Sequence, residues 1–264
     1  MRPRSGFTLI ELLVVLGVIA ILAALLRPAL GHAKAKGQAA TCLGNLRQLN
    51  TCWILYANDH QDVVPPNESA LVNGIWRSSS NSWIGYSSAP YDTNFVPIQN
   101  GLLFVYDYNR SVAIYHCPGD ISHPRASFNA PLMSMLRTRT YSMSGCWDGR
   151  TNEIQTTVSR LSQAPNPSKL FLFIDENEDS IDDAQFLTWP NPDNRWVNLP
   201  SGRHSQSGVL SFADGHAENW PWKWPKVFEP KESYWKVAAN ALDLEDLRRL
   251  QAATLPFTDF RAQQ

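Results

Sequence analysis

An unbroken apolar segment near the N-terminus constrains the fold of this chain more than any other feature. Residues 7–26 read FTLIELLVVLGVIAILAALL and carry a single charge, on Glu11. As an α-helix, about 20 residues reach roughly 30 Å, which is the thickness of the hydrocarbon core of a bilayer. We therefore expect residues 7–26 to form a transmembrane helix and the rest of the chain to fold outside the membrane.

The position of the small residues indicates that this apolar segment survives processing. Ser5 and Gly6 precede the segment, whereas a secretory signal peptide has a shorter apolar stretch and a small-residue cleavage site after it. Basic residues flank the segment on both sides, two before it and three shortly after it, so the positive-inside rule does not settle the orientation.

Glu11 is the anomaly within the segment. An ionisable group near the bilayer centre costs roughly 2.5 to 3.5 kcal/mol on insertion scales. Such a side chain needs a partner.

The N-terminal residues resemble those of type IV prepilins and type II secretion pseudopilins, in which a short basic leader ends in glycine before Phe-Thr-Leu-Ile-Glu. Gly6, Phe7, Glu11 and Pro28 all fall on that pattern. The resemblance implies cleavage after Gly6 by a prepilin peptidase, N-methylation of Phe7 and a role for Glu11 in assembly with other pilin or pseudopilin subunits. It also implies a pilin-like α+β fold, with a long N-terminal helix packed against an antiparallel β-sheet head. The alternative is an ordinary single-pass anchor with a chance glutamate.

Beyond Pro28, which we expect to kink or loosen the helix, the sequence stays helix-compatible to about Asn58. Apolar residues at three- and four-residue spacing form one stripe that should lie against the head; they are Cys42, Leu46, Leu49, Trp53 and Tyr56. The expected organisation is a leader (1–6), a transmembrane helix (7–26), its continuation along the head (27–60), a β-rich globular head (61–220) and a C-terminal tail with a short helix (221–264).

The head is expected to be an antiparallel sheet, because short strand-like runs alternate with Gly, Pro, Asn and Ser clusters. The clearest runs are 101–106, 113–117, 170–174 and 208–212. In the tail, leucines at helical spacing between residues 241 and 253 predict a short helix that docks on the head.

His204 and the Asp214-Gly215 pair fit an H-x9-DG pattern. This pattern, and an Asn-Leu-Arg-Gln-Leu segment at residues 45–49, resemble large-headed prepilin-like proteins of the Planctomycetes and Verrucomicrobia type. Asp214-Gly215 lies between two strand-like runs and predicts a two-residue type I′ hairpin turn. His204 either makes a structural hydrogen bond or takes part with Asp214 in catalysis or metal binding.

An acidic run at residues 174–183 also resembles a stretch of that large-headed family. Asp175, Glu176, Asp179 and Asp182 are hard oxygen ligands that suit calcium. An EF-hand that began at Asp175 would lack its glycine and its final glutamate. The alternative is a solvated acidic loop without a metal ion.

The four cysteines suggest disulfides if the head is exported to the periplasm. Cys42 and Cys52 lie about 15 Å apart along one helix, too far for a disulfide. Each can instead pair with Cys117 or Cys146, and of these two arrangements we favour Cys42 with Cys117 and Cys52 with Cys146. A zinc site around Cys117 and its neighbouring histidines would lack a paired CxxC arrangement.

These observations favour a structural subunit of a type II secretion pseudopilus or a type IV pilus-like filament. The head would lie in the periplasm on a single inner-membrane span, or at the cell surface within a filament. A net charge of -1 gives no electrostatic footprint for nucleic acid, and no catalytic motif indicates an enzyme. The alternative is a pilin-anchored adhesin whose cluster at Trp220, Trp222 and Trp224 binds glycans, although such residues more often cover the edge of a core.

Overall fold

The computed structural model describes residues 8–73, 75–86, 92–105, 108–124, 134–148, 157–189, 191–227 and 235–255. Gly6 and Phe7 lie outside these ranges, so the predicted processing site has no structural account. The helices are α1 (Leu9–Asp59), α2 (Val96–Gln99), α3 (Leu102–Val105) and α4 (Ala241–Gln251), with 3-10 turns η2 (Val112–Tyr115), η3 (Leu161–Gln163) and η4 (Pro167–Lys169). The strands are β1 (Ser69–Val72), β2 (Ile75–Ser78), β3 (Tyr141–Ser144), β4 (Phe171–Asp175), β5 (Gln185–Phe186), β6 (Arg195–Trp196), β7 (Ser207–Phe212), β8 (Ala217–Pro221) and β9 (Lys236–Val237).

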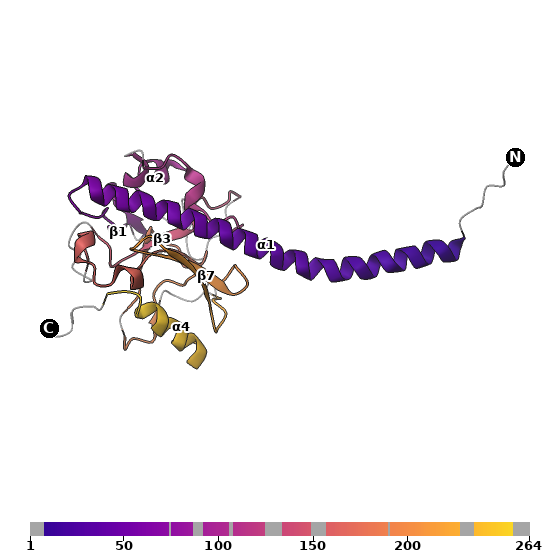
Figure 1. Cartoon of the computed structure of the whole chain (residues 1–264). Coiled ribbons are helices and arrows are strands. Elements are labelled where there is room, and N and C mark those ends of the chain that lie inside the picture. Colours follow the sequence, from indigo (N-terminus) through magenta and orange to yellow (C-terminus); the bar gives the residue numbers. More distant parts are fainter. Residues whose placement is uncertain are drawn as a thin grey trace.

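Helix α1 is one continuous helix of 51 residues, about 75 Å long. Its N-terminal half projects from the head as a stalk, and its C-terminal half lies across the head (Figure 1). The helix runs through position 28 without a break and ends at Asp59, six residues before Pro65. The expected long N-terminal helix is therefore confirmed.

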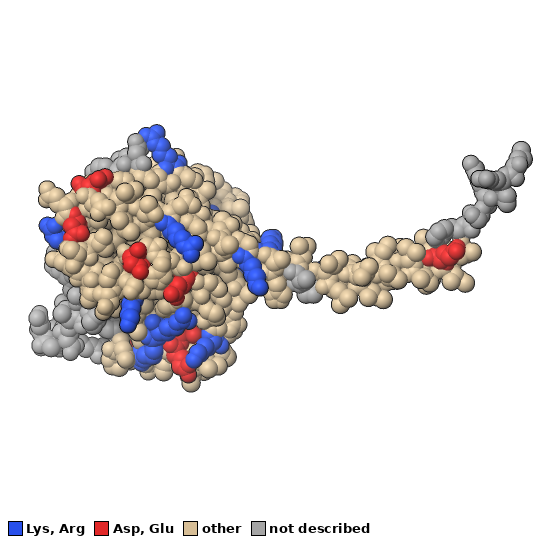
Figure 2. All heavy atoms as spheres, in the orientation of Figure 1, with Lys and Arg blue, Asp and Glu red and all other residues tan. Residues whose placement is uncertain are grey.

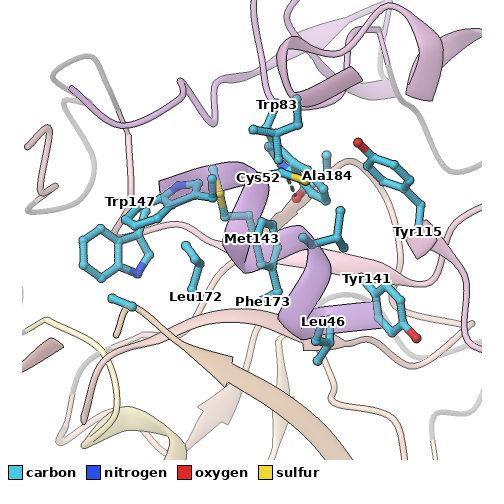
Figure 3. Packing of buried hydrophobic residues seen from close by; sticks show 14 of the residues in the cluster. Leu46, Cys52, Trp83, Tyr115, Tyr141, Met143, Trp147, Leu172, Phe173 and Ala184 are labelled. Atoms are coloured by element: carbon cyan, nitrogen blue, oxygen red, sulfur yellow. Dashed lines mark hydrogen bonds between the residues drawn. The ribbon is translucent and has the colours of Figure 1, made fainter. Parts of the chain in front are cut away.

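The apolar stripe of α1 packs on the head as predicted. Cys42, Leu46, Leu49, Trp53 and Tyr56 are all buried, the most exposed of them at 7%. Figure 3 shows α1 side chains among residues that come from several parts of the head, including Trp83, Tyr115 and Phe173. This half of α1 is thus a core element of the head.

The head is built on a five-stranded sheet in the order β5-β3-β4-β7-β8. Neighbouring strands are antiparallel except β3 and β5, which are parallel. Both central strands, β4 and β7, are buried along their whole length, because α1 covers one face of the sheet and α4 the other. The result is an α+β fold of the pilin-like kind, with helix, sheet and helix in three layers.

The second face of the sheet packs against α4 and the aromatic segments around it. Leu247 and Leu250 of α4 are fully buried in the same cluster as Phe171 and Leu210. Asn240 caps α4 by accepting hydrogen bonds from two backbone amides. The predicted C-terminal helix is therefore present and docked.

Two of the four predicted strands are wrong. Residues 101–106 contain the helix α3, and residues 113–117 overlap the 3-10 turn η2. A short apolar run has the same composition in a buried strand and in a single helical turn, so periodicity cannot separate them. The runs at 170–174 and 208–212 are the central strands β4 and β7.

The predicted hairpin at Asp214-Gly215 exists, but its turn type differs. β7 and β8 pair across a three-residue loop, in which Phe212 N donates to His216 O and Gly215 N donates to Phe212 O. Gly215 has φ of 100°, whereas Asp214 has negative φ. This is a type I turn followed by a left-handed glycine, the usual three-residue hairpin loop, and it needs positive φ at one position only.

Candidate functional site

The stalk of α1 exposes an apolar surface that the head does not cover. An 18-residue window of α1 has mean hydropathy 3.0 and none of it is buried, so α1 is long and apolar enough to cross a membrane. Leu9, Leu13, Val15 and Ile19 are between 46% and 78% exposed. In Figure 2 the stalk carries an acidic side chain near its free end, while basic and acidic side chains are interspersed over the head. A surface of this kind must be covered by lipid or by other apolar helices.

Glu11 closes the first turn of α1 in a capping box. Thr8 N and Thr8 Oγ1 each donate to Glu11 Oε2 over 2.8 Å, and Glu11 N donates to Thr8 Oγ1 over 3.3 Å. The glutamate therefore has an intrachain hydrogen-bonding role as well as the predicted role in assembly. Thr-Leu-Ile-Glu fits the capping-box pattern, a sequence signal from which this role could have been predicted.

The acidic run is largely a buried polar network. Asp175 and Glu176 are fully buried, and Asp183 is 5% exposed, so the predicted solvated loop is wrong for these residues. Asp179 is exposed, and Glu178 and Asp182 are half-buried.

The four predicted calcium ligands are not brought together. Asp175 Oδ1 accepts from Arg203 over 2.5 Å, whereas Glu176 accepts from Ser142, and Asp182 accepts from the amide of Asp183. Among the described residues, the side chains that lie close enough to hold a metal ion are those of Cys42, Cys117 and His204. Calcium binding by the acidic run gains no support from the structure.

Glu176 anchors this network. Its Oε2 accepts from Ser142 Oγ over 2.5 Å, and its Oε1 accepts from Ser180 Oγ and Asn198 Nδ2 over 2.9 and 2.8 Å. Burial raises the pKa of Glu176 to about 7, although these hydrogen bonds and Arg139 act in the opposite direction. The carboxyl group thus binds its proton more tightly in the folded chain than in the unfolded chain.

Replacement of Glu176 by Gln should change how stability depends on pH. A raised pKa stabilises the fold fully below the ordinary value of 4.5, and this contribution is lost as pH rises through about 7. The variant should match the natural chain at low pH and exceed it above neutrality by on the order of 3 kcal/mol. Denaturant unfolding of the detergent-solubilised chain, followed by tryptophan fluorescence at a series of pH values, measures this difference.

Glu245→Gln is the matched control, because Glu245 is a surface carboxylate, 53% exposed, that pairs with Lys223. An exposed pair of this kind contributes about 0 to 1 kcal/mol, so its pH profile should follow that of the natural chain. A Glu176→Gln profile parallel to the natural one at all pH values would contradict the raised pKa.

A second polar cluster joins α1 to the head. Cys42 on α1 lies with its Sγ 2.6 Å from Sγ of Cys117, which follows η2. His204, in the loop before β7, places Nε2 3.2 Å from Cys117 Sγ and 3.9 Å from Oδ2 of Asp175 at the end of β4. All four residues are buried, and His204 is the most exposed at 4%.

Burial and mutual contacts shift the pKa values of the groups in this cluster. The contact with Cys42, burial and Asp175 all raise the pKa of Cys117. Burial lowers the pKa of His204, but its contacts with Cys117 and Asp175 outweigh burial, and the net shift is upward. Burial also raises the pKa of Asp175 against the opposing effect of Arg203.

All four cysteines are free thiols in the structure, so neither predicted disulfide is formed. The predicted partners Cys42 and Cys117 are nevertheless adjacent. Cys52 Sγ instead contacts Tyr108 O over 3.3 Å, and Cys146 Sγ contacts Ser144 Oγ over 3.2 Å. Burial raises the pKa of each of these two thiols to about 11. The contacts of Cys52 and Cys146 indicate separate buried thiols.

The two ends of the H-x9-DG pattern serve different sites. His204 belongs to the buried cluster with Cys117, while Asp214 lies in the β7–β8 turn, where its Oδ1 accepts from His216 N over 3.2 Å. Strand β7 separates them. The structure does not bring His204 and Asp214 together as a catalytic or metal-binding pair.

The tryptophan cluster belongs largely to the core. Trp220 and Trp222 are 6% and 4% exposed, and Trp222 Nε1 donates to Ser201 O over 2.8 Å. Lys226 follows the cluster and pairs with Asp243 and Asp246 of α4, each over 2.7 Å. The two buried tryptophans thus belong to the head, and Lys226 ties the segment that follows them to α4.

The similarity found between this chain and known proteins lies in the N-terminal residues. Residues 1–26 match the family model described as the prokaryotic N-terminal methylation motif. No curated protein and no solved structure matches the chain. The long apolar helix and this motif fit membrane anchoring of a pilin-like protein. The chain thus carries a prepilin-type N-terminus, which implies processing by prepilin peptidase and assembly with pilin-type subunits in general.

Proposed function

We propose that the chain is a structural subunit of a type II secretion pseudopilus or of a type IV pilus-like filament. Prepilin peptidase removes residues 1–6, and the stalk of α1 first spans the inner membrane and then packs with the stalks of other subunits. The head lies in the periplasm or on the surface of the assembled filament. The subunit has no catalytic role in this proposal.

The exposed apolar stalk carries the proposal. The same helix that is a core element of the head continues into about 30 residues whose described side chains are almost all exposed. A rigid connection of this kind lets a subunit leave the membrane only if other apolar helices replace the lipid. A bundle of identical stalks supplies such a surface without exposing it to water.

The tryptophan cluster gives little support to the alternative role as a glycan-binding adhesin. Trp220 and Trp222 are buried among head residues and offer no open ring face to a glycan, and of the three tryptophans in the cluster Trp224 alone keeps substantial exposure, at 38%. Carbohydrate stacking requires exposed aromatic faces. We therefore favour the structural role.

Processing gives a direct test. The mature protein extracted from membranes should begin with N-methyl-Phe7, because Gly6 precedes the apolar segment and Phe7 begins it. Intact-mass and N-terminal peptide mass spectrometry measure this. Gly6→Leu should retain the leader, since a bulky side chain replaces the small residue at the cleavage site. An intact Met1 or Arg2 terminus on the natural chain, in cells with active prepilin peptidase, would contradict the proposal.

A further inference from the structure

The cluster of Cys42, Cys117 and His204 is the group of potential metal ligands that the described residues bring together. One ligand atom from each lies within 4.8 Å of the others, and all three residues are buried. We propose that these three residues bind one zinc ion. The carboxylate of Asp175 completes the set as the fourth ligand. This site does not depend on the proposed function, because it lies between α1 and the head of a single chain.

The ligand types suit zinc. Structural zinc sites are four-coordinate and use thiolate, imidazole and carboxylate groups, so two cysteines, one histidine and one aspartate form an acceptable set. The residues come from four separate elements: α1, the segment after η2, the end of β4 and the loop before β7. A bound ion would therefore hold the helix to the head at the point where the stalk emerges.

The distances agree in part with tetrahedral coordination. Ligand atoms on one zinc ion lie roughly 3.3 to 3.8 Å apart, given bonds of about 2.0 to 2.3 Å. The Cys117 Sγ to His204 Nε2 distance of 3.2 Å and the His204 Nε2 to Asp175 Oδ2 distance of 3.9 Å are close to that range. The two sulfurs, at 2.6 Å, must separate by about 1 Å, which a small side-chain rotation provides.

The cluster contains a buried oxygen without a partner. Oδ2 of Asp175 has no hydrogen-bond partner among the described residues and lies 3.9 Å from Nε2 of His204. An unpaired carboxylate oxygen in a fully buried position is costly. Coordination of Asp175 Oδ2 to a cation removes that cost.

Charge balance also favours a divalent cation. Two thiolates and the carboxylate of Asp175 carry three negative charges, and Arg203 cannot balance them alone because it also pairs with Asp120 and Glu178. Arg203 Nη1 already donates to Asp175 Oδ1 over 2.5 Å, so it fixes the carboxylate with its other oxygen free for the metal. Such an outer partner is usual for a metal ligand.

A disulfide between Cys42 and Cys117 is the competing arrangement. The sulfur separation of 2.6 Å lies between the disulfide bond length of about 2.05 Å and the spacing of two thiolates on zinc, so this distance does not decide. If Cys42 and Cys117 formed a disulfide, Asp175 Oδ2 would stay without a hydrogen-bond partner and His204 Nε2 would have no metal ion to bind. The zinc site accounts for all four groups.

Metal analysis of the full chain tests the proposal. The chain, extracted in detergent without chelator, should contain about one zinc ion per molecule by mass spectrometry of metals. Cys117→Ser and His204→Ala should lose it. Cys146→Ser, a substitution of an equally buried cysteine outside the cluster, should keep it. Circular dichroism shows which variants remain folded.

Cobalt replacement gives a readout on the natural chain. Co²⁺ should produce the visible bands of tetrahedral coordination together with thiolate-to-metal charge transfer. Asp175→Asn should keep the charge-transfer band and weaken cobalt binding by about tenfold or more. Unchanged affinity in that variant would remove Asp175 from the ligand set.

Two results on the natural chain would overturn the zinc site. Peptide mapping that finds Cys42 linked to Cys117 in metal-free protein would establish the disulfide. Metal-free protein in which both thiols react with an alkylating reagent after unfolding would establish a hydrogen-bonded thiol cluster.

Discussion

Glu11→Leu should reach the membrane at normal or higher abundance and yet assemble into filaments at least about tenfold less well. The substitution removes a charge that costs roughly 2.5 to 3.5 kcal/mol near the bilayer centre, so insertion improves. It also removes the carboxylate that would pair with the Phe7 amine of a neighbouring subunit. A charge pair in an apolar bundle sets the stagger between stalks because an unpaired member is strongly disfavoured. Filament yield and membrane-fraction abundance are measured together.

The capping box demands controls that separate two roles of Glu11. Glu11→Gln keeps an acceptor for Thr8 N and removes the charge, so it should fail to assemble like the Leu variant. Thr8→Ala removes the hydroxyl that contacts Glu11 and keeps the carboxylate, so it should assemble. Glu11→Asp should be intermediate, because the charge remains and its reach shortens. Normal assembly of the Gln variant would assign the glutamate to helix capping alone.

The sequence predicts the stalk and the centre of the fold because both follow from local patterns. A run of about 20 apolar residues and a stripe at helical spacing report directly on α1. β4 and β7 each contain consecutive apolar residues, are bounded by turn residues and lie in the middle of the sheet, so composition and structure agree. Their neighbour β5 is two residues long and pairs in parallel with β3, and no local signal marks such a strand.

The sequence does not indicate which polar groups are buried. The acidic run around Glu176 has the composition of a solvent-exposed loop, but Ser142 and Asn198 approach it from distant parts of the chain and satisfy its carboxylate. These hydrogen bonds join residues 34 and 22 positions apart, and no local sequence pattern predicts contacts over such separations. Local composition therefore predicted a solvated loop where the structure has a buried one.

The cysteine cluster shows the same limit. The prediction placed Cys42 beside Cys117 and identified His204 as part of a pattern, but nothing in the sequence connects the two observations. Their convergence depends on how α1 crosses the sheet, which is decided by packing of the apolar stripe. The sequence groups Asp175 with its neighbours, either as calcium ligands or as a solvated loop, whereas its side chain faces Arg203 and His204.

Trp53→Ala should destabilise the head by about 3 to 5 kcal/mol, the range for removal of a large buried aromatic side chain. Trp53 is fully buried on α1, and its ring meets that of Trp147 edge-on, with 5.1 Å between the ring centroids. Trp147 in turn donates from Nε1 to Phe171 O of β4 over 2.9 Å. Loss of Trp53 thus opens a cavity where α1 meets the sheet, and filament yield should fall with stability. Denaturant unfolding followed by near-UV circular dichroism measures the change.

Two variants distinguish this packing effect from a general effect on the helix. Leu55→Ala lies on the same helix but 42% exposed, so it should change stability by no more than about 0.5 kcal/mol. Trp53→Phe should cost distinctly less than the Ala variant, because Nε1 of Trp53 has no hydrogen-bond partner among the described residues and its removal deletes a buried unsatisfied donor. Equal unfolding midpoints for Trp53→Ala and Leu55→Ala would mean that packing of Trp53 against the sheet does not stabilise the head.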